Sequence, residues 1–322
     1  MSRSRIVALG GGHGLSASLQ ALRHTSDDIT AIVTVADDGG SSGRLREQFD
    51  ILPPGDLRMA LAALCEDTSW GHQWSAVLQH RFGGEGELGG HALGNLLITA
   101  LWDLLPEQQV RGLDLVGRLL NTRGRVLPMS LIPLDIEATL RVADPADPEV
   151  AERIVIRGQS QLAKHPGQVE SIRLLPEAPP ACPEALESIK LADVVVLGPG
   201  SWFTSVMPHL LVPDLLDALR HTPAQRVLTL NVSLNDDETN GTTVAEHVEA
   251  ISAHAPDLTF DHVIADPQVL GSPEDRAALE EAVLRVGAEL VVTSVGKMRT
   301  PGVHDTLRLA AAYRDVIQAA QP

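Results

Sequence analysis

The chain has 322 residues, 44% of them hydrophobic, and a formal net charge of −17 at pH 7. This apolar fraction provides a sizeable core for one large or two ordinary domains, which excludes an intrinsically disordered protein. The acidic balance argues against nucleic-acid binding, because neutralising phosphates requires clustered Lys and Arg, and the sequence has no such block.

Signals for membranes, secretion and metals are missing from the sequence. No stretch reaches the 18 or more apolar residues of a membrane span, and the apolar run before the first glycines is too short for a signal peptide. Cys65 and Cys182 have no CxxC or zinc spacing and are expected as buried thiols in a reducing cytosol. We therefore expect a cytoplasmic protein with no membrane span, in which no residue is assigned as a metal ligand and magnesium stays open as a cofactor.

The first 38 residues predict one βαβ unit. Residues 5–12 (RIVALGGG) form a short apolar strand that ends in glycines, and residues 15–24 place leucines at helical spacing. Residues 29–38 (ITAIVTVADD) form a second strand rich in β-branched residues. A strand, a glycine-rich turn, a helix and a strand in this order are typical of half a parallel sheet.

The middle of the chain has a different pattern. Four helices are predicted, at 55–67, 74–82, 90–105 and 107–121. Short β-like segments follow at 125–130, 137–142, 153–158 and 169–175. We interpret 57–176 as a helical and then a small β-rich insertion.

The strand and helix alternation returns in the last part of the chain. Strands are predicted at 192–201, 226–233, 261–267 and 288–295, with helical stretches between them. Nearly continuous apolar strands indicate a parallel sheet covered on both faces. The expected fold is therefore α/β, with a doubly wound, mostly parallel sheet formed by 1–56 and 177–322.

The first candidate site is the glycine run after the first strand. Gly12-x-Gly14-x-x-Ala17 fits the dinucleotide fingerprint, and it lies between a strand and a helix as that motif requires. Glycine lets a phosphate approach backbone N–H groups at the positive end of the helix. The alternative is a turn used only for packing, and His13 either donates to a phosphate or faces solvent.

The second candidate site follows the second strand, in residues 36–46 (ADDGGSSGRLR). Asp37 lies where an acid that binds the ribose of NAD is found, which keeps a nicotinamide dinucleotide open as a ligand. Asp37 and Asp38 together suit magnesium or sugar hydroxyls, and arginines nearby suit an anion. An exposed turn is the alternative. Further candidates for oxyanion contacts in this run are Gly39, Gly40, Ser41, Ser42, Arg44 and Arg46.

The third candidate site is a second glycine turn, residues 197–205 (LGPGSWFTS). In a doubly wound sheet, ligands bind at the carboxyl ends of strands where the strand order reverses, so two such loops suit a diphosphate. Trp202 and Phe203 either stack on a base or pack in the core. The polar candidates of this loop are Ser201, Thr204 and Ser205.

Three other polar residues are weaker candidates. Asp56 and Asn95 stand at predicted helix starts, where a cap and a ligand contact are both open. Asn231 begins the stretch 231–243 (NVSLNDDETNGTT), which lines the crevice or forms an acidic surface turn. The sequence has no HExxH, GxSxG or Walker A motif, so no catalytic residue is assigned.

Seven segments taken in order resemble one family across nearly the whole chain. They are GGGHGLSASLQAL, ITAIVTVADDGGSSGRLR, PPGDLRMAL, GHALGNLL, RGRVLP, LGPGSWFTSVMPHLLVP and HDTLRLA. They resemble the YvcK proteins, also called gluconeogenesis factors, which are similar to the phospholactate transferase CofD. The resemblance implies a Rossmann-like core and a regulatory protein that binds UDP-sugars, including UDP-N-acetylglucosamine. It also implies links to gluconeogenic growth, cell shape and peptidoglycan synthesis.

The resemblance places a nucleotide-sugar ligand at the glycine loops. The predicted binding residues, from motifs and resemblance together, are Gly11, Gly12, His13, Gly14, Leu15, Asp37, Asp38, Gly39, Gly40, Ser41, Ser42, Arg44, Asn95, Gly198, Gly200, Ser201, Thr204 and Asn231. The sequence departs from the family at His13, where the family has Thr, and at Val303, where a basic residue is common. Regulatory protein partners and a homo-oligomer are compatible with this assignment.

Two other functions stay open. In the transferase branch, the same crevice carries a nucleotide-linked donor and magnesium, so the alternative is a magnesium-dependent transferase. An NAD-linked oxidoreductase rests on the fingerprint alone and has no candidate for hydride transfer.

Overall fold

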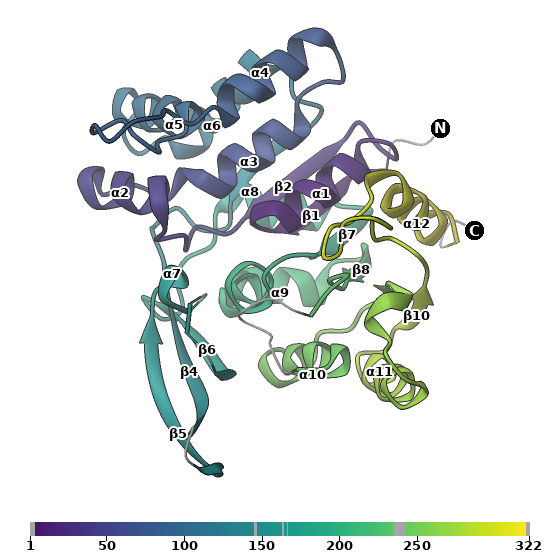
Figure 1. The fold of residues 1–322 in the computed structure, drawn as a ribbon. Coiled ribbons are helices and arrows are strands. Elements are labelled where there is room, and N and C mark those ends of the chain that lie inside the picture. The colour runs from purple at the N-terminus through teal and green to yellow at the C-terminus, as the bar shows by residue number, and fades with distance from the viewer. Residues whose placement is uncertain (1–3, 145–146, 163, 166, 235–241, 320–322) are drawn as a thin grey trace.

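The computed structural model describes residues 4–144, 147–162, 164–165, 167–234 and 242–319. Its centre is a seven-stranded sheet in the order β10-β9-β8-β7-β1-β2-β3 (Figure 1). Every neighbouring pair in this sheet is parallel. The strands are β1 (Ile6–Gly10), β2 (Ile29–Val33), β3 (Arg125–Pro128), β7 (Val194–Leu197), β8 (Gln225–Thr229), β9 (His262–Ala265) and β10 (Glu289–Val292).

Apolar, β-branched residues make the central strands fully buried. All five residues of β1 and all four of β7 are buried, which is expected of parallel strands covered on both faces. The flanking helices are α1 (Gly12–Leu22), α3 (Pro54–Leu64), α8 (Pro183–Leu191), α9 (Pro213–His221), α10 (Val244–His254), α11 (Pro273–Arg285) and α12 (Thr306–Ala319). The predicted α/β fold with a mostly parallel sheet is confirmed.

The strand order reverses between β1 and β7. From β1 the chain moves outward through β2 to β3, and from β7 it moves the other way through β8 and β9 to β10. The register pairs Leu9 of β1 with Leu197 of β7, so both strands end level with each other. The glycine loops that follow them therefore begin side by side, at the position where open α/β sheets bind ligands.

The residues between β2 and β3 in the sequence form a layer of helices. It contains α2 (Gly40–Phe49), α4 (Ser69–Gln79), α5 (Leu93–Leu104) and α6 (Gln109–Leu120), together with α3. In Figure 1 the helices α4, α5 and α6 form the upper edge of the molecule, above α3. The helix α2 was not predicted, because its glycine and serine start is typical of a turn.

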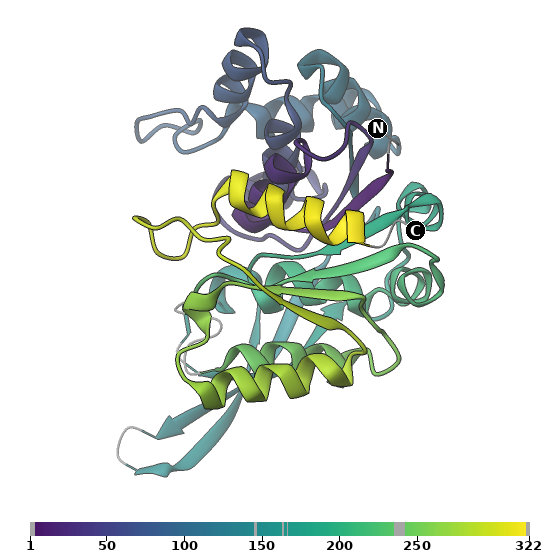
Figure 2. The same cartoon turned by 90° about the vertical axis from the view of Figure 1, so that its right-hand side faces the viewer.

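The second sheet is small and antiparallel, in the order β5-β4-β6. It contains β4 (Asp135–Asp144), β5 (Asp147–Arg157) and β6 (Gln168–Leu175), and the short helix α7 (Gln159–Leu162) follows β5. The β4 and β5 strands extend away from the rest of the molecule (Figure 2). This sheet matches the β-rich segment predicted from the sequence.

One predicted element lies in a different sheet. Residues 125–130 were expected in the small β-rich section, but β3 is the edge strand of the main sheet and pairs with β2. The reason is burial: Val126 and Leu127 are 2% and 0% exposed and complete the core beside β2. The range 57–176 therefore also contributes one strand to the main sheet.

Candidate functional site

The two glycine loops contact each other through their backbones. A Cβ atom on Gly14 would collide with the Pro199 carbonyl oxygen and with the Gly200 Cα atom. Only a glycine therefore allows the start of α1 to lie against the loop after β7. The sequence predicted two separate loops at one sheet edge, and the structure brings them into direct contact.

The first loop leaves backbone groups open at the start of α1. Gly12 has a φ of +56°, which favours glycine, and a Cβ there would have only Asp56 Oδ1 within 4 Å, at 4.0 Å. Gly11 is the N-cap and has no side chain to cap this helix, and the Gly12 N–H donates to the Asp56 carboxylate. Uncapped N–H groups at a helix start are suited to an anion.

The neighbours of these glycines have different environments. Leu15 is 1% exposed and belongs to the core, so only its backbone is available to a ligand. His13 is exposed at the surface.

The second loop is held in place by Asn231. The Gly200 N–H donates to Asn231 Oδ1, and Asn231 Nδ2 donates to the Gly200 carbonyl oxygen, both at 2.9 Å. Asn231 therefore uses its amide to position the loop. Gly198 has a φ of +73°, and a Cβ there would lie 2.7 Å from the Thr229 carbonyl oxygen. Residues 235–241 of the predicted acidic stretch lie outside the described residues.

Most side chains directly after Gly200 are buried and therefore not accessible to a ligand. Ser201 precedes a π-helical turn, η1 (Trp202–Val206), and is partly exposed. Trp202 is 0% exposed and stacks on the His247 ring at 5.0 Å, and Phe203 is 5% exposed. Stacking of either ring on a ligand base is therefore excluded in this conformation. Thr204 and Ser205 are also buried, which leaves Ser201 as the accessible hydroxyl.

A pair of carboxylates lies beside the first loop. A Cβ on Gly11 would lie 2.5 Å from Asp56 Oδ2, and a Cβ on Gly55 would lie 3.0 Å from Asp37 Oδ2. Burial raises the pKa of Asp56 to about 7, and the charge of Asp37 adds to this, although the Gly12 N–H opposes it. Burial also raises the pKa of Asp37, against hydrogen bonds from Gly39 and Ser42.

Asp56 is not the helix cap that its sequence position suggested. The N-cap of α3 is Pro53, and Asp56 lies inside the first turn, where its carboxylate reaches Gly12. From the sequence alone a cap and a ligand contact are equally open for Asp56, so it is not among the predicted binding residues. The available signal was an acidic residue placed directly after a Pro-Pro-Gly helix start at the sheet edge.

Asp38 points to the small sheet. Its Oδ1 accepts a hydrogen bond of 2.7 Å from the Ser160 N–H at the start of α7. Gly158 packs so closely on the other carboxylate oxygen that a Cβ there would collide with it. Asp37 and Asp38 are therefore separated in their contacts, although they are adjacent in the chain.

The remaining residues of the 36–46 run are divided between surface and interior. Gly40 has a φ of +48°, and a Cβ there would have no atom within 4 Å. Ser41 and Ser42 are buried in the first turn of α2. Arg44 is exposed and donates to the Gly89 carbonyl oxygen, whereas Arg46 pairs with Asp135 at 2.6 Å.

A buried hydrogen-bond chain connects three helical segments next to the carboxylates. Arg58 Nε donates to Asn95 Oδ1 at 2.8 Å, and Asn95 Nδ2 donates to Ser41 Oγ at 3.0 Å. Ser41 Oγ also lies 2.9 Å from His91 Nδ1. Ser41 and Asn95 were predicted as ligand contacts, but here their side chains bind each other.

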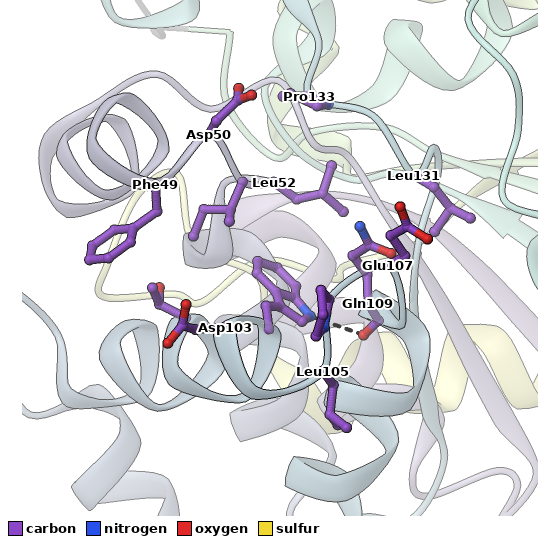
Figure 3. Close-up of a pocket in the computed structure, with 13 residues that line it drawn as sticks. Phe49, Asp50, Leu52, Asp103, Leu105, Glu107, Gln109, Leu131 and Pro133 are labelled. Atoms are coloured by element: carbon purple, nitrogen blue, oxygen red, sulfur yellow. Dashed lines mark hydrogen bonds between the residues drawn. The ribbon is translucent and has the colours of Figure 1, made fainter.

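A separate cavity of about 270 Å³ lies between the end of α2 and the start of α6. Trp102, Leu52 and Leu131 form apolar parts of its wall, and Asp50, Asp103 and Glu107 stand around it (Figure 3). None of its lining residues belongs to the glycine loops. Neither motif spacing nor hydropathy had indicated it.

Metal-binding groups and membrane-spanning helices were searched for among the described residues. Within these residues no group of three or more His, Cys, Asp or Glu side chains is arranged to hold a metal ion. No helix among them has both the length and the apolar composition to cross a bilayer.

The geometry defines an α/β protein whose two glycine loops meet at the reversal point of its sheet, and the comparisons assign the family. The sequence profile described as "2-phospho-L-lactate transferase CofD" matches residues 6–303, and the chain belongs to this CofD family.

Relatives from other bacteria match almost the whole chain. A "Putative gluconeogenesis factor" of Mycobacterium tuberculosis is 49% identical over 311 residues, which cover 97% of this chain and 90% of the relative. A "Gluconeogenesis factor" of Halalkalibacterium halodurans is 36% identical over 303 residues, covering 94% and 88%. A crystal structure of a UPF0052 family member from Bacillus halodurans has a TM-score of 0.82 at 33% identity, covering 97% and 99%.

Proposed function

We propose that the crevice between the two glycine loops binds the diphosphate of a UDP-sugar, and that the protein is a regulator. The observation that supports this proposal is the contact of Gly14 with Pro199 and Gly200, because it brings the backbone groups of both loops together at one edge of the sheet. A diphosphate carries negative charge on both phosphates, so two neighbouring glycine loops suit it better than a single phosphate.

The biological role is inferred from the family. The names of the curated relatives support a role in gluconeogenic growth. UDP-N-acetylglucosamine is a precursor of the cell wall, so a protein that senses it could couple carbon supply to peptidoglycan synthesis and cell shape. We propose UDP-N-acetylglucosamine and UDP-glucose as the ligands, with no redox reaction.

The test is calorimetry with UDP-N-acetylglucosamine, UDP-glucose and NAD. We expect the UDP-sugars to bind and Ser201→Ala to weaken them by roughly 0.5–1.5 kcal/mol, or more if the hydroxyl contacts a charged oxygen. Gly12→Val should block the approach of the phosphate. Gly84→Val is its control, because Gly84 also has a positive φ and open space around it but lies outside the crevice. No heat with either UDP-sugar would contradict the proposal, as would NADH formation from a small alcohol.

A magnesium-dependent transferase is the second candidate, and the Asp37 and Asp56 carboxylates favour it. Two carboxylates beside a phosphate site suit a hydrated magnesium ion, which would compensate their charges, and burial raises the pKa of both when no cation is bound. When bound, magnesium would neutralise charge on a phosphate. Asp37 and Asp56 would hold the ion, and the Gly12 N–H would orient Asp56. Release of UMP from a UDP-sugar with magnesium, as expected if the sugar phosphate is transferred, and its loss in Asp56→Asn, would support this candidate over a regulator.

A further inference from the structure

Three arginines near the start of α5 have no carboxylate partner. Many arginines of this acidic chain form ion pairs, as Arg46 does with Asp135 and Arg125 with Asp114. By contrast, Arg44, Arg58 and Arg81 form no ion pair with any described residue. The charges of Asp56 and Asp37 act on Arg58 from further away, whereas Arg44 and Arg81 have no salt-bridge partner among the described residues.

Arg44 and Arg81 bind neighbouring carbonyl groups of the same turn. Arg44 Nη2 donates to the Gly89 carbonyl oxygen at 2.7 Å, and Arg81 Nη1 donates to the Gly90 carbonyl oxygen at 2.9 Å. Both side chains are exposed at the surface. A carbonyl oxygen orients a guanidinium without cancelling its charge, so each keeps further N–H donors for a ligand.

Arg58 is buried behind this turn. It is 3% exposed, and a Cβ on Gly94 would lie 2.8 Å from its Cγ atom, so the start of α5 packs directly on the arginine stem. Its Nε binds Asn95, but its two Nη groups have no hydrogen-bond partner among the described residues. Burial and the charge of Arg81 together lower the pKa of Arg58 to about 10. The charges of Asp56 and Asp37 partly oppose this lowering, and the Nη groups keep N–H donors for an anion.

Two helix starts meet at the same place. The helices α2 and α5 both begin without a side-chain cap. The bond from Asn95 to Ser41 joins their first turns, and Ser41 in turn contacts His91. Uncapped helix starts add partial positive charge to that of the arginines. Glu85 and Glu87 lie on the adjoining loop, are exposed, and form no ion pair with these arginines in the described structure.

We propose that Arg44, Arg58 and Arg81 form a second anion subsite, which binds the phosphate group of a small molecule other than the nucleotide sugar. Guanidinium forks and helix starts are both typical phosphate ligands. Asp56 stands between Arg58 and the first glycine loop, and its carboxylate repels a continuous polyanion. The subsite therefore takes a separate phosphate, and it does not depend on whether a UDP-sugar binds.

The test is calorimetric titration with inorganic phosphate at constant ionic strength. We expect the double substitution Arg44→Gln with Arg81→Gln to weaken phosphate binding at least tenfold. The matched control is Arg111→Gln with Arg118→Gln, which removes the same charge from exposed positions on α6 and should leave binding unchanged. Arg58→Lys, which keeps the charge but removes the fork, should give an intermediate loss. A substitution of the buried Arg58 can also disturb folding, so the test is decided by the exposed pair Arg44 and Arg81.

A loop variant separates this subsite from the glycine crevice. In Gly12→Ala, phosphate should still bind, and adding Arg44→Gln and Arg81→Gln should remove that binding. The proposal is overturned if the wild type binds no phosphate, if Gly12→Ala alone abolishes binding, or if the control pair loses as much as the test pair. A failure of UDP-glucose to bind the wild type would contradict the proposed function and leave this phosphate result unaffected.

Discussion

Asp56 is held in a position where its charge is unfavourable. Its pKa of about 7 in the folded protein lies above the ordinary value of 3.8, because burial and Asp37 oppose ionisation. The folded state therefore binds an extra proton between these pH values, and the unfolded chain does not. The stabilising effect is complete below about pH 4 and is lost as the pH rises through 7.

The corresponding prediction concerns Asp56→Asn. We expect the variant to gain stability over the wild type as the pH rises from about 5 to about 8, by at most about 3 kcal/mol, because about two pKa units at 1.36 kcal/mol each fall in this range. Urea unfolding at both pH values measures it, with the exposed Asp103→Asn as control. A difference between variant and wild type that is the same at both pH values would show that Asp56 ionises normally.

At the scale of elements, the approach of α1 to the loop after β7 depends on a single missing side chain. In Gly14→Ala the new Cβ would meet the Pro199 oxygen and the Gly200 backbone, which cannot rotate away. We expect a loss of about 1–3 kcal/mol in unfolding free energy from this overpacking, together with loss of any UDP-sugar binding. Gly83→Ala is the control, because a Cβ there would have no atom within 4 Å. Equal melting temperatures for the two variants would show that the loops separate without cost.

The small sheet is connected to the crevice through Asp38 and Arg46. Asp38→Ala removes the acceptor of the Ser160 N–H at the start of α7, and loss of such a cap lowers stability by about 0.5–2 kcal/mol. Asp38→Asn keeps an oxygen at that position and should lose much less. Hydrogen exchange over 135–175 measures the effect. Identical exchange in Asp38→Ala and wild type would mean that this contact does not hold the sheet.

For the whole molecule, the net charge of −17 predicts a response to salt. Raising the ionic strength from about 0.01 M to about 0.15 M shortens the screening length from about 30 Å to about 8 Å. Repulsion among the excess carboxylates should weaken, so the melting temperature should rise with KCl. The measurement is thermal unfolding at fixed pH. A fall in melting temperature would instead mean that the surface ion pairs outweigh the repulsion.

Sequence patterns predicted the parts of the fold that depend on local order. The strand β1 ends at Gly10, and β7 ends at Leu197 directly before Gly198. Glycine loops that follow parallel strands in this way lie at one edge of the sheet. The position of β3 was missed, because pairing with β2 joins segments more than 90 residues apart and depends on burial rather than on pattern. The bonds from Arg58 through Asn95 to Ser41 were also missed, since they need three helical segments to meet in space.

The burial of both cysteines has a practical consequence for following ligand binding in solution. Cys65 and Cys182 are buried free thiols, as expected from the sequence, and burial raises their pKa values to about 11 and about 12. They should therefore react slowly with thiol reagents near neutral pH. Val155 on β5 is 63% exposed, so Val155→Cys offers one site for selective attachment of a fluorophore. Because Asp38 and Arg46 connect this sheet to the loop that carries Asp37, the emission of the dye would report from a distance on events in the crevice.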